Sequence, residues 1–454
     1  MNENQKGCPP RPLRPLAVQS VQGFAHAYPA VQPVQCVNRA VADRHRRSPC
    51  IVPAAPTPIR RNLATALRRE AKRYPVITLT GPRQSGKTTL CQQVFRGKRY
   101  LSFESLDNRA RAEHDPRGLL AEYRDGAVFD EVQHVPDLLS YLQSDVDERP
   151  APGRFVLTGS QQLGLSAAIS QTLAGRTAVL ELHPPSLDEL WRFTKPPVGL
   201  WPTIFVGAYP RIHDQHIPPA RWLADYVATY VQRDVRQVLA VGDLRTFTTV
   251  LRLAAGRTGQ ELNLSSLGAD VGVSYNTIRS WISVLEASYL CFVIPAWHQS
   301  QRKRWVKTPK LHWFDSGLVC HLLGIENDRQ LTTHPLRGAL FESWVASEIW
   351  KSHTSRGVVP RLVHFRETRG SEVDVGVVHG RAITLVEAKS GATVNADYFA
   401  SLRSIREDLA SGGPFDDIAA AVVYGGGQAQ RRSEAAVMPW SGIAGRDWTR
   451  SRHV

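Results

Sequence analysis

The 454-residue sequence has few cysteines, and no two of them are closely spaced. The six lie at Cys8, Cys36, Cys50, Cys91, Cys291 and Cys320. Because none forms a Cys-x-x-Cys pair, the sequence predicts neither a zinc site nor a disulfide framework. A chain without disulfides is typical of a reducing compartment, so we expect a cytoplasmic protein.

Long hydrophobic runs are also missing. The longest apolar stretch, around Tyr289 to Trp297, is far shorter than the ~18 residues that a membrane-spanning helix needs. The first residues lack the apolar core of a secretory signal peptide. We therefore expect no membrane partner.

Acidic residues are outnumbered by basic ones. The 56 Lys and Arg against 41 Asp and Glu give a formal net charge of +15. A basic balance favours contact with polyanions such as DNA. The excess of basic residues is spread thinly along the chain, however, and an Arg-rich proteome would produce the same distribution. Composition alone leaves both interpretations open.

Patterning along the chain divides it into segments of different character. Strand and helix patterns alternate in the first folded part, which predicts a parallel α/β sheet. Repeated Pro, Gln and Val without periodicity, before that part, indicate a disordered arm or a start codon assigned too far upstream. The expected divisions are an arm at 1–55, an α/β domain at 56–194, a mainly helical region at 203–330, a C-terminal domain at 336–440 and a tail at 441–454.

A glycine-rich segment follows a short apolar strand, Val76–Leu79. It reads GPRQSGKT and has the phosphate-loop spacing Gly-x-x-x-x-Gly-Lys-Thr. The glycines let successive N–H groups point at phosphate oxygens, and the helix that follows adds its N-terminal partial charge. We expect Lys87 to reach the β- and γ-phosphates of ATP and the Thr88 hydroxyl to ligate Mg²⁺. The residues predicted to bind these cofactors are Gly81, Pro82, Arg83, Gln84, Ser85, Gly86, Lys87, Thr88 and Thr89.

A second apolar strand ends in two carboxylates. In the run GAVFDE, Asp130 is placed to hold the metal and Glu131 to polarise the attacking water. An ordinary strand that ends in acidic residues is the alternative. A further strand-like segment, Lys98 to Glu104, separates this run from the phosphate loop in the chain, an order seen in ATPases with a catalytic Glu.

A fourth strand, Arg154 to Leu157, ends in Thr-Gly-Ser. Ser160 is a candidate sensor of the γ-phosphate, or alternatively a simple helix cap. Arg176 and Arg233 are candidate stabilisers of phosphate charge, although surface solvation is the usual role of a lone Arg.

Residues 263–284 have the pattern of a helix-turn-helix, with a tight turn at Gly272 and a second helix capped by Ser274. The strand-like segment Tyr289 to Ile294 follows, which suggests a winged helix. A DNA-reading second helix would expose Tyr275, Asn276 and Arg279. Since that helix has only one basic residue, a structural or protein-contacting winged helix is slightly favoured. A basic cluster follows, which either contacts phosphates or forms a solvated loop: Arg302, Lys303, Arg304, Lys307 and Lys310.

The C-terminal segment combines an amphipathic helix containing Glu342 with a charged hairpin. A turn at His379–Arg381 would bring Asp374 close to Glu387 and Lys389. Two carboxylates can share a second divalent metal, Mg²⁺ or Mn²⁺, while Lys389 steadies phosphate charge, as in metal-dependent nucleases. This D…ExK spacing is loose, and a surface hairpin with scattered charges would show it too.

The chain resembles, from about Ile59 to Trp440, the AAA-superfamily ATPases of bacteria and archaea that carry a C-terminal domain of unknown function. The resemblance is carried by LTGPRQSGKTTL, FDEVQHVPDLLSYLQ, FVLTGSQQL, LAGRTAVLELHPPSLDEL, YVQRDVRQV, TPKLHWFDSGL, GALFESWV and VEAKS. It implies an AAA-type core, a winged helix and a restriction-endonuclease-like C-terminal fold. The site residues that it implies are Lys87, Thr88, Asp130 and Glu131 for the nucleotide, Ser160 as a sensor, and Asp374, Glu387 and Lys389 for a nuclease site, whether active or not.

Two functions fit these features. The first is an ATPase whose hydrolysis drives a conformational change around DNA or a partner, with a nuclease-like domain attached. The second is a nucleotide-gated regulatory protein whose nuclease-like domain binds without cutting. The presence of Asp374, Glu387 and Lys389 favours the first function. The low positive charge of the recognition helix favours the second. The sequence leaves the DNA or protein partner, and the number of subunits in any oligomer, open.

Overall fold

A computed structural model describes residues 58–160, 172–231, 244–297, 305–368 and 370–451. The expectation for residues 1–55 therefore falls outside the described residues. Within the described ranges, no helix is long and apolar enough to cross a membrane.

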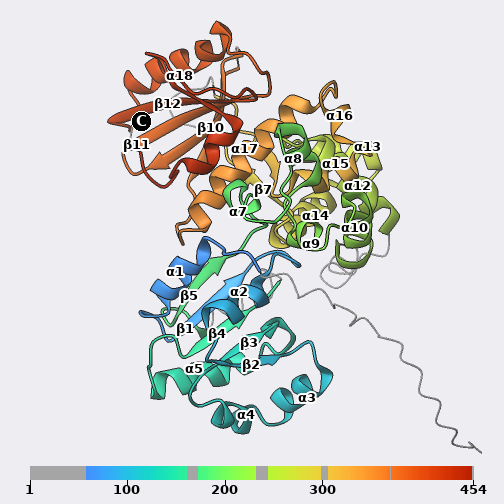
Figure 1. Cartoon of the computed structure of the whole chain (residues 1–454), viewed down its shortest axis with the longest axis vertical. Coiled ribbons are helices and arrows are strands. Elements are labelled where there is room, and N and C mark those ends of the chain that lie inside the picture. The colour runs from blue at the N-terminus through green and yellow to red at the C-terminus, as the bar shows by residue number, and fades with distance from the viewer. Residues whose placement is uncertain (1–57, 161–171, 232–243, 298–304, 369, 452–454) are drawn as a thin grey trace, which may run out of the picture. The chain divides into compact units, whose positions relative to one another are not determined.

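The N-terminal part contains a five-stranded sheet in the order β2-β3-β4-β1-β5, with every strand parallel to its neighbours (Figure 1). The predicted parallel α/β sheet is thus confirmed. Its elements are α1 (Leu63–Glu70), β1 (Val76–Thr80), α2 (Lys87–Val94), β2 (Arg99–Ser102), α3 (Leu106–His114), α4 (Pro116–Glu122), β3 (Ala127–Asp130), the 3₁₀ helix η1 (Val132–His134), α5 (Leu138–Glu148), β4 (Phe155–Thr158), β5 (Thr177–Glu181) and α7 (Leu187–Leu190).

Both faces of this sheet are covered, which explains why its central strands read as continuous apolar runs. Every residue of β1, β3 and β4 is buried. One face packs against α1 and α2 and the other against α3, α4 and α5. In space β4 lies between β1 and β3, and β2 forms the edge of the sheet. The carboxyl ends of β1, β3 and β4 consequently meet at one edge, where polar residues follow each strand.

The middle part is mainly helical, as expected. Its elements are α8 (Leu200–Val206), α9 (Pro210–Asp214), α10 (Pro219–Tyr226), the π-helical turn η2 (Val227–Val231), α12 (Leu244–Gly256), β6 (Gln260–Glu261), α13 (Leu264–Val271), α14 (Tyr275–Ala287), β7 (Cys291–Ile294), β8 (Lys310–Trp313), α15 (Ser316–Leu322) and α16 (Asp328–Leu331). The three short strands form an antiparallel sheet in the order β6-β8-β7.

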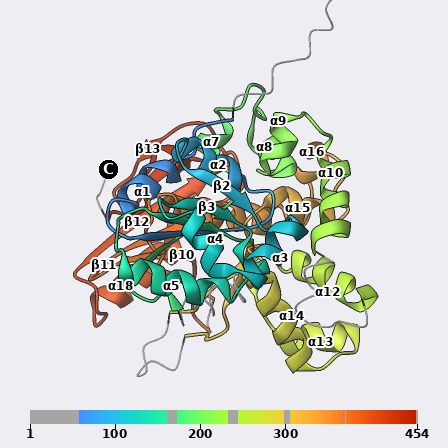
Figure 2. The ribbon, with the colours of Figure 1, turned by 90° about the horizontal axis from the view of Figure 1, so that it is seen from below.

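The predicted helix-turn-helix is confirmed as α13 and α14, which lie side by side in Figure 2. Gly272 ends α13 in the left-handed conformation, with φ 73°, that a glycine adopts without strain. The Ser274 hydroxyl accepts a hydrogen bond from the Thr277 backbone N–H and so caps α14. The apolar face of α14 is buried, and Tyr275, Asn276 and Arg279 are exposed as predicted.

The C-terminal part contains a separate mixed sheet of six strands, in the order β13-β14-β12-β11-β10-β9. Helix α18 packs on one of its faces and the long helix α17 on the other. The predicted hairpin is β10 and β11, joined at Gly380. The elements are α17 (Arg337–Thr354), β9 (Leu362–Arg366), β10 (Glu372–His379), β11 (Ala382–Lys389), the 3₁₀ helix η3 (Ala396–Phe399), α18 (Ala400–Ala410), β12 (Asp417–Tyr424), β13 (Gln430–Arg431), β14 (Ala436–Pro439) and the 3₁₀ helix η4 (Trp440–Gly445).

Candidate functional site

The loop between β1 and α2 has the backbone shape that its glycines permit. Gly81 has φ 143° and Gly86 has φ 92°, both in the region that side-chain-bearing residues rarely adopt. A Cβ atom at Gly81 would lie 2.2 Å from the carbonyl oxygen of Leu182, so no larger residue fits there. Gln84 also has a positive φ, of 63°. The loop is therefore bent into the tight curve that its sequence pattern predicts.

Lys87 begins α2 and is almost completely buried. Its ammonium donates hydrogen bonds of 2.9 Å to the carbonyl oxygens of Gly81 and Pro82, and so holds the loop in its curved form. Burial lowers the pKa of Lys87, while the carboxylates of Glu131 and Asp130 act in the opposite direction. A buried cation inside a loop of this shape is suited to bind a phosphate group.

Asp130 ends β3 and is the meeting point of three hydroxyl groups. The Thr88 hydroxyl donates to its Oδ2 atom at 3.0 Å. The hydroxyls of Tyr100 and Thr158 also donate to this carboxylate, from β2 and β4. The pair Thr88 and Asp130 supplies the hard oxygen donors that Mg²⁺ prefers. Tyr100 and Thr158 were not identified from the sequence as members of this site.

Glu131 lies next to Asp130 in a left-handed conformation, with φ 57°, which is rare for a non-glycine residue and is typical of functional sites. Its carboxylate accepts hydrogen bonds from the Ser160 hydroxyl, at 3.0 Å, and from the Gln133 amide. Burial opposes ionisation, but the charge of Lys87 and these two hydrogen bonds outweigh it and lower the pKa of Glu131. Glu131 is thus a carboxylate at neutral pH, as a general base must be.

A cavity of about 350 Å³ opens beside the loop. The predicted residues that line it are Arg83, Gln84, Gly86, Lys87, Thr88, Thr89, Asp130 and Glu131. Glu104, the α9 residues Pro210, Arg211 and Asp214, and Gln215 directly after α9 complete the lining. The α9 residues are far from the loop in the sequence and had no motif to reveal them. The curved loop, buried ammonium and Thr88–Asp130 pair all fit a nucleotide with Mg²⁺.

Of the two candidate arginines, the structure describes only Arg176. Arg176 forms an ion pair of 2.6 Å with Asp147 and is not among the residues that line the cavity. The expectation that it stabilises phosphate charge is thus not supported, and its surface interpretation holds. Arg233 lies outside the described residues.

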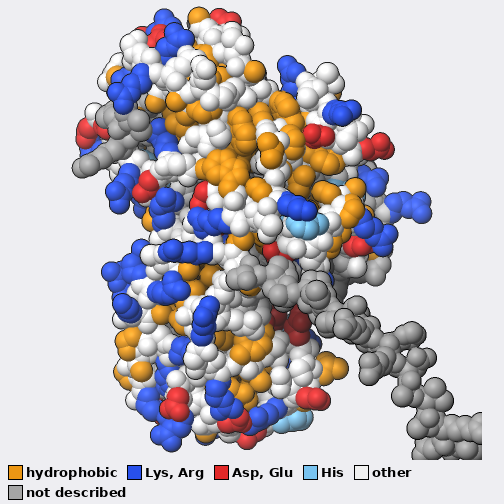
Figure 3. Space-filling view, viewed as in Figure 1, with side chains coloured by type: hydrophobic (Ala, Val, Ile, Leu, Met, Phe, Trp, Pro, Cys, Tyr) orange, Lys and Arg blue, Asp and Glu red, His pale blue; other side chains and the backbone are white. Residues whose placement is uncertain are grey.

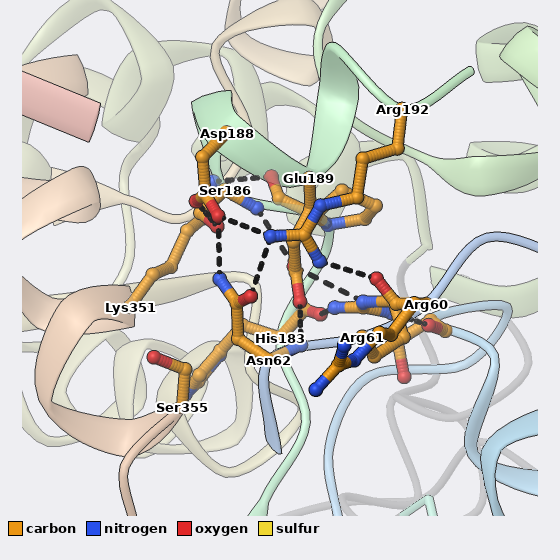
Figure 4. A network of polar contacts seen from close by, with 12 residues as sticks. Arg60, Arg61, Asn62, His183, Ser186, Asp188, Glu189, Arg192, Lys351 and Ser355 are labelled. Atoms are coloured by element: carbon orange, nitrogen blue, oxygen red, sulfur yellow. Dashed lines mark hydrogen bonds and ion pairs between the residues drawn. The ribbon is translucent and has the colours of Figure 1, made fainter. Parts of the chain in front are cut away.

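Arg61 contacts the phosphate loop, a role that the sequence did not suggest, and belongs to the polar network around His183 and Glu189 in Figure 4. Its guanidinium donates to the carbonyl oxygens of Ser85, at 2.8 Å, and His183, at 2.7 Å. It also forms a buried ion pair of 3.0 Å with Glu189. The segment that contains His183 and Glu189 also contacts α17. Its Leu187 N–H donates a hydrogen bond of 2.8 Å to the Glu348 carboxylate of that helix. The phosphate loop is therefore connected by polar contacts to the C-terminal part of the chain.

The second predicted site, in the hairpin, is also brought together. Asp374 and Glu387 each adjoin the Val375–Val386 pair of β10 and β11, and the Asp374 Oδ2 atom accepts a hydrogen bond of 2.8 Å from Ala388 N–H. Lys389 forms an ion pair of 2.5 Å with Glu387. Burial and the charge of Asp374 raise the pKa of Glu387 to about 8. The predicted proximity of the three residues is thus observed.

The prediction that Lys310 belongs to a surface basic cluster is wrong. Its side chain is 1% exposed and its ammonium lies among three carboxylates, 2.6 Å from Glu342, 2.5 Å from Glu372 and 3.5 Å from Asp374. Although Lys307 is exposed as expected, Arg302, Lys303 and Arg304 fall outside the described residues. The sequence interpretation failed because nothing local marks one Lys of a basic run as buried.

The residues around Asp374 and Glu387 do not fit a second divalent metal in this arrangement. Within the described ranges, no group of three His, Cys, Asp or Glu side chains is placed to hold a metal ion. The position toward which Glu342, Glu372 and Asp374 converge is taken by the Lys310 ammonium. The prediction of a second metal ion is thus not supported.

Comparisons with known proteins agree with the loop geometry. Residues 73–191 match the family model described as "AAA domain". The chain contains an AAA-type P-loop domain. Residues 199–329 and 337–443 match two models, each described as a domain of unknown function, DUF8612 and DUF4143. The AAA-type domain is thus followed by additional domains, as the resemblance implied.

Two curated relatives are uncharacterized proteins of Mycobacterium tuberculosis and Mycobacterium bovis. Each is 29% identical over 329 residues, which cover 70% of this chain and 71% of the relative. Among solved structures, the chain is similar to the Walker-type ATPase PABY2304 of Pyrococcus abyssi, with a TM-score of 0.37 and 14% identity over 57% of this chain and 94% of that one. It is also similar to AMPPCP-bound DnaA from Aquifex aeolicus, with a TM-score of 0.26 and 14% identity over 49% and 85%.

Proposed function

We propose that this protein binds ATP with Mg²⁺ at the cavity beside the phosphate loop and hydrolyses it, and that hydrolysis changes the conformation of the attached domains. One observation carries the proposal. Lys87, Thr88, Asp130 and Glu131, from two separate segments, line a single cavity of about 350 Å³. A buried cation, a hydroxyl–carboxylate pair and an ionised base are the groups that phosphoryl transfer to water needs.

Each residue then has a distinct role. Lys87 binds oxygens of the β- and γ-phosphates, and the Thr88 hydroxyl and Asp130 hold the metal. Mg²⁺, when bound, neutralises charge on the phosphates. The Glu131 carboxylate takes a proton from the attacking water, and Ser160 and Gln133 keep that carboxylate oriented through their hydrogen bonds. Arg83, Gln84, Ser85, Gly86 and Thr89 complete the loop.

For the attached domains, a binding role that involves no cleavage is better supported than DNA cutting. We propose that α12, β6, α13, α14, β7 and β8 form a winged helix that serves as a contact module; their order along the chain supports this. The exposed face of α14 carries Arg279 as its single basic residue. On the face seen in Figure 3, Lys and Arg side chains lie scattered among apolar and neutral surface. A surface with so few clustered basic residues is better suited to bind a protein partner than to bind DNA. Cleavage through Asp374, Glu387 and Lys389 stays a prediction.

ATP hydrolysis is tested directly by steady-state phosphate release from the purified protein. We expect release that requires Mg²⁺, stops on addition of a chelator and is lost in Lys87→Ala. Arg211→Ala, in the same cavity but outside the loop, shows whether the α9 side of the lining contributes. Phosphate release that is equal in the wild type and Lys87→Ala would mean that the activity does not come from this site.

Nucleotide affinity is a separate prediction. Lys87→Ala removes a buried charge from the phosphates, so the Kd for ATP in titration calorimetry should rise about tenfold or more. Lys98→Ala is a suitable control, because Lys98 is a partly buried Lys whose ammonium donates to the Arg154 carbonyl instead. An unchanged Kd in Lys87→Ala would remove the phosphate loop from the proposal.

A further inference from the structure

The acidic centre of the C-terminal part contains a cation that the chain itself supplies. Lys310 begins β8, in the middle part of the chain, and reaches carboxylates of two C-terminal elements. Glu342 comes from α17, and Glu372 and Asp374 come from β10. The distances from its ammonium to Glu342 and Glu372, 2.6 and 2.5 Å, are those of short charge-assisted hydrogen bonds. Lys310 is fully buried there, so water does not separate these charges.

The geometry of β10 places these carboxylates around one point. The pairing of β10 with β9 shifts between Val373 and Gly376, so β10 carries an extra residue beside Asp374. Such bulges re-aim side chains and are common next to functional sites. Asp374 thereby contacts Lys310 through Oδ1 while its Oδ2 accepts from Ala388 N–H. Both oxygens of Asp374 are engaged without any external ligand.

One acceptor in this centre is left over. The Oε2 atom of Glu387 is buried and has no hydrogen-bond partner among the described residues. An unpaired buried carboxylate oxygen is unfavourable, so the cations present leave one acceptor of this centre unsatisfied. The Glu387 carboxylate forms an ion pair with Lys389 through its other oxygen, Oε1. The buried carboxylates of this centre thus favour cations, and the Lys310 ammonium takes the position on which most of them converge.

We propose that the Lys310 ammonium is the resident cation of this acidic centre and takes the place of a divalent metal, so that the C-terminal domain does not bind metal or cleave DNA while Lys310 is in position. An ammonium and a divalent metal repel each other and compete for the same oxygens, so both do not fit at once. The ion pairs also tie β8 to β10 and α17. This inference concerns the C-terminal centre alone and does not depend on ATP hydrolysis.

The test is Mn²⁺ binding by the full-length protein without nucleotide. We expect the wild type to match Asp374→Asn, because neither has a metal position at this centre. Lys310→Met removes the ammonium but keeps an apolar stem, and should gain one Mn²⁺ site that is lost again in Lys310→Met/Asp374→Asn. The gained site should bind at least about tenfold more tightly than anything in the wild type. Lys307→Met, at an exposed lysine of the same segment, should change nothing.

Loss of Lys310 leaves buried carboxylates unpaired and can prevent folding. Lys310→Met/Glu372→Gln removes one negative charge together with the positive one, and carries the same expectation of a gained, Asp374-dependent site. A wild type that already binds Mn²⁺ through Asp374, or that cleaves DNA with Mn²⁺ in an Asp374-dependent way, would overturn the proposal. So would folded Lys310→Met and Lys310→Met/Glu372→Gln proteins that gain no site.

Discussion

Replacement of Glu131 by Gln should leave ATP bound and slow phosphate release about a hundredfold or more. The amide keeps the shape of the side chain, and Ser160 and Gln133 remain beside it, so the cavity is preserved. What disappears is the ionised group that takes a proton from water. Since the pKa of Glu131 is lowered, the wild-type carboxylate is already ionised at neutral pH, and the full effect is visible there.

A matched control is Glu104→Gln, an exposed carboxylate that lines the same cavity. It should change turnover little, because Glu104 has no contact with Asp130 or Lys87 in the described structure. Calorimetry with ATP shows whether Glu131→Gln still binds, and phosphate release measures turnover. Equal rates for Glu131→Gln and the wild type would exclude Glu131 as the base, whereas a loss of ATP binding would indicate a structural role instead.

The contacts that the sequence predicts well are those made within one short segment. The phosphate loop and the start of α2 are contiguous, so the positions of Gly81, Gly86 and Lys87 follow from their spacing. Asp130 and Glu131 line the same cavity as the phosphate loop because a parallel sheet gathers the carboxyl ends of its strands at one edge, and their catalytic roles stay predictions. Ser160 follows the same rule, since β4 lies beside β3, and its hydroxyl donates to Glu131; its role as a sensor of the γ-phosphate stays a prediction.

Contacts between distant segments escaped prediction for a physical reason. Lys310 and Asp374, or Arg61 and Glu189, meet only because whole elements pack together, and no local pattern records which partner a charged residue finds. The charge run that contains Lys310 is the same in sequence whether its members face water or carboxylates. Strand alternation gives the face of a residue but not what covers that face.

Arg61→Met should destabilise the AAA domain by about 3–5 kcal/mol. Arg61 is 7% exposed and Glu189 is 3% exposed, so the variant leaves a carboxylate buried without its ion-pair partner. The carbonyl oxygens of Ser85 and His183 lose a donor as well. Breaking one side of a buried pair is costly because the remaining charge is not rehydrated. The measurement is urea unfolding followed by circular dichroism.

Figure 4 also contains a control for this prediction. Arg192 belongs to the same network and donates to Asp188 and Asn62, but its side chain is 33% exposed. Because water screens its ion pair, Arg192→Met should cost no more than about 1 kcal/mol. In Arg61→Met/Glu189→Gln neither partner is charged, and this double variant should recover part of the loss. If Arg61→Met is no more destabilising than Arg192→Met, the buried pair does not hold the phosphate loop in place, and the loop's curvature must depend on Lys87 and the glycines alone.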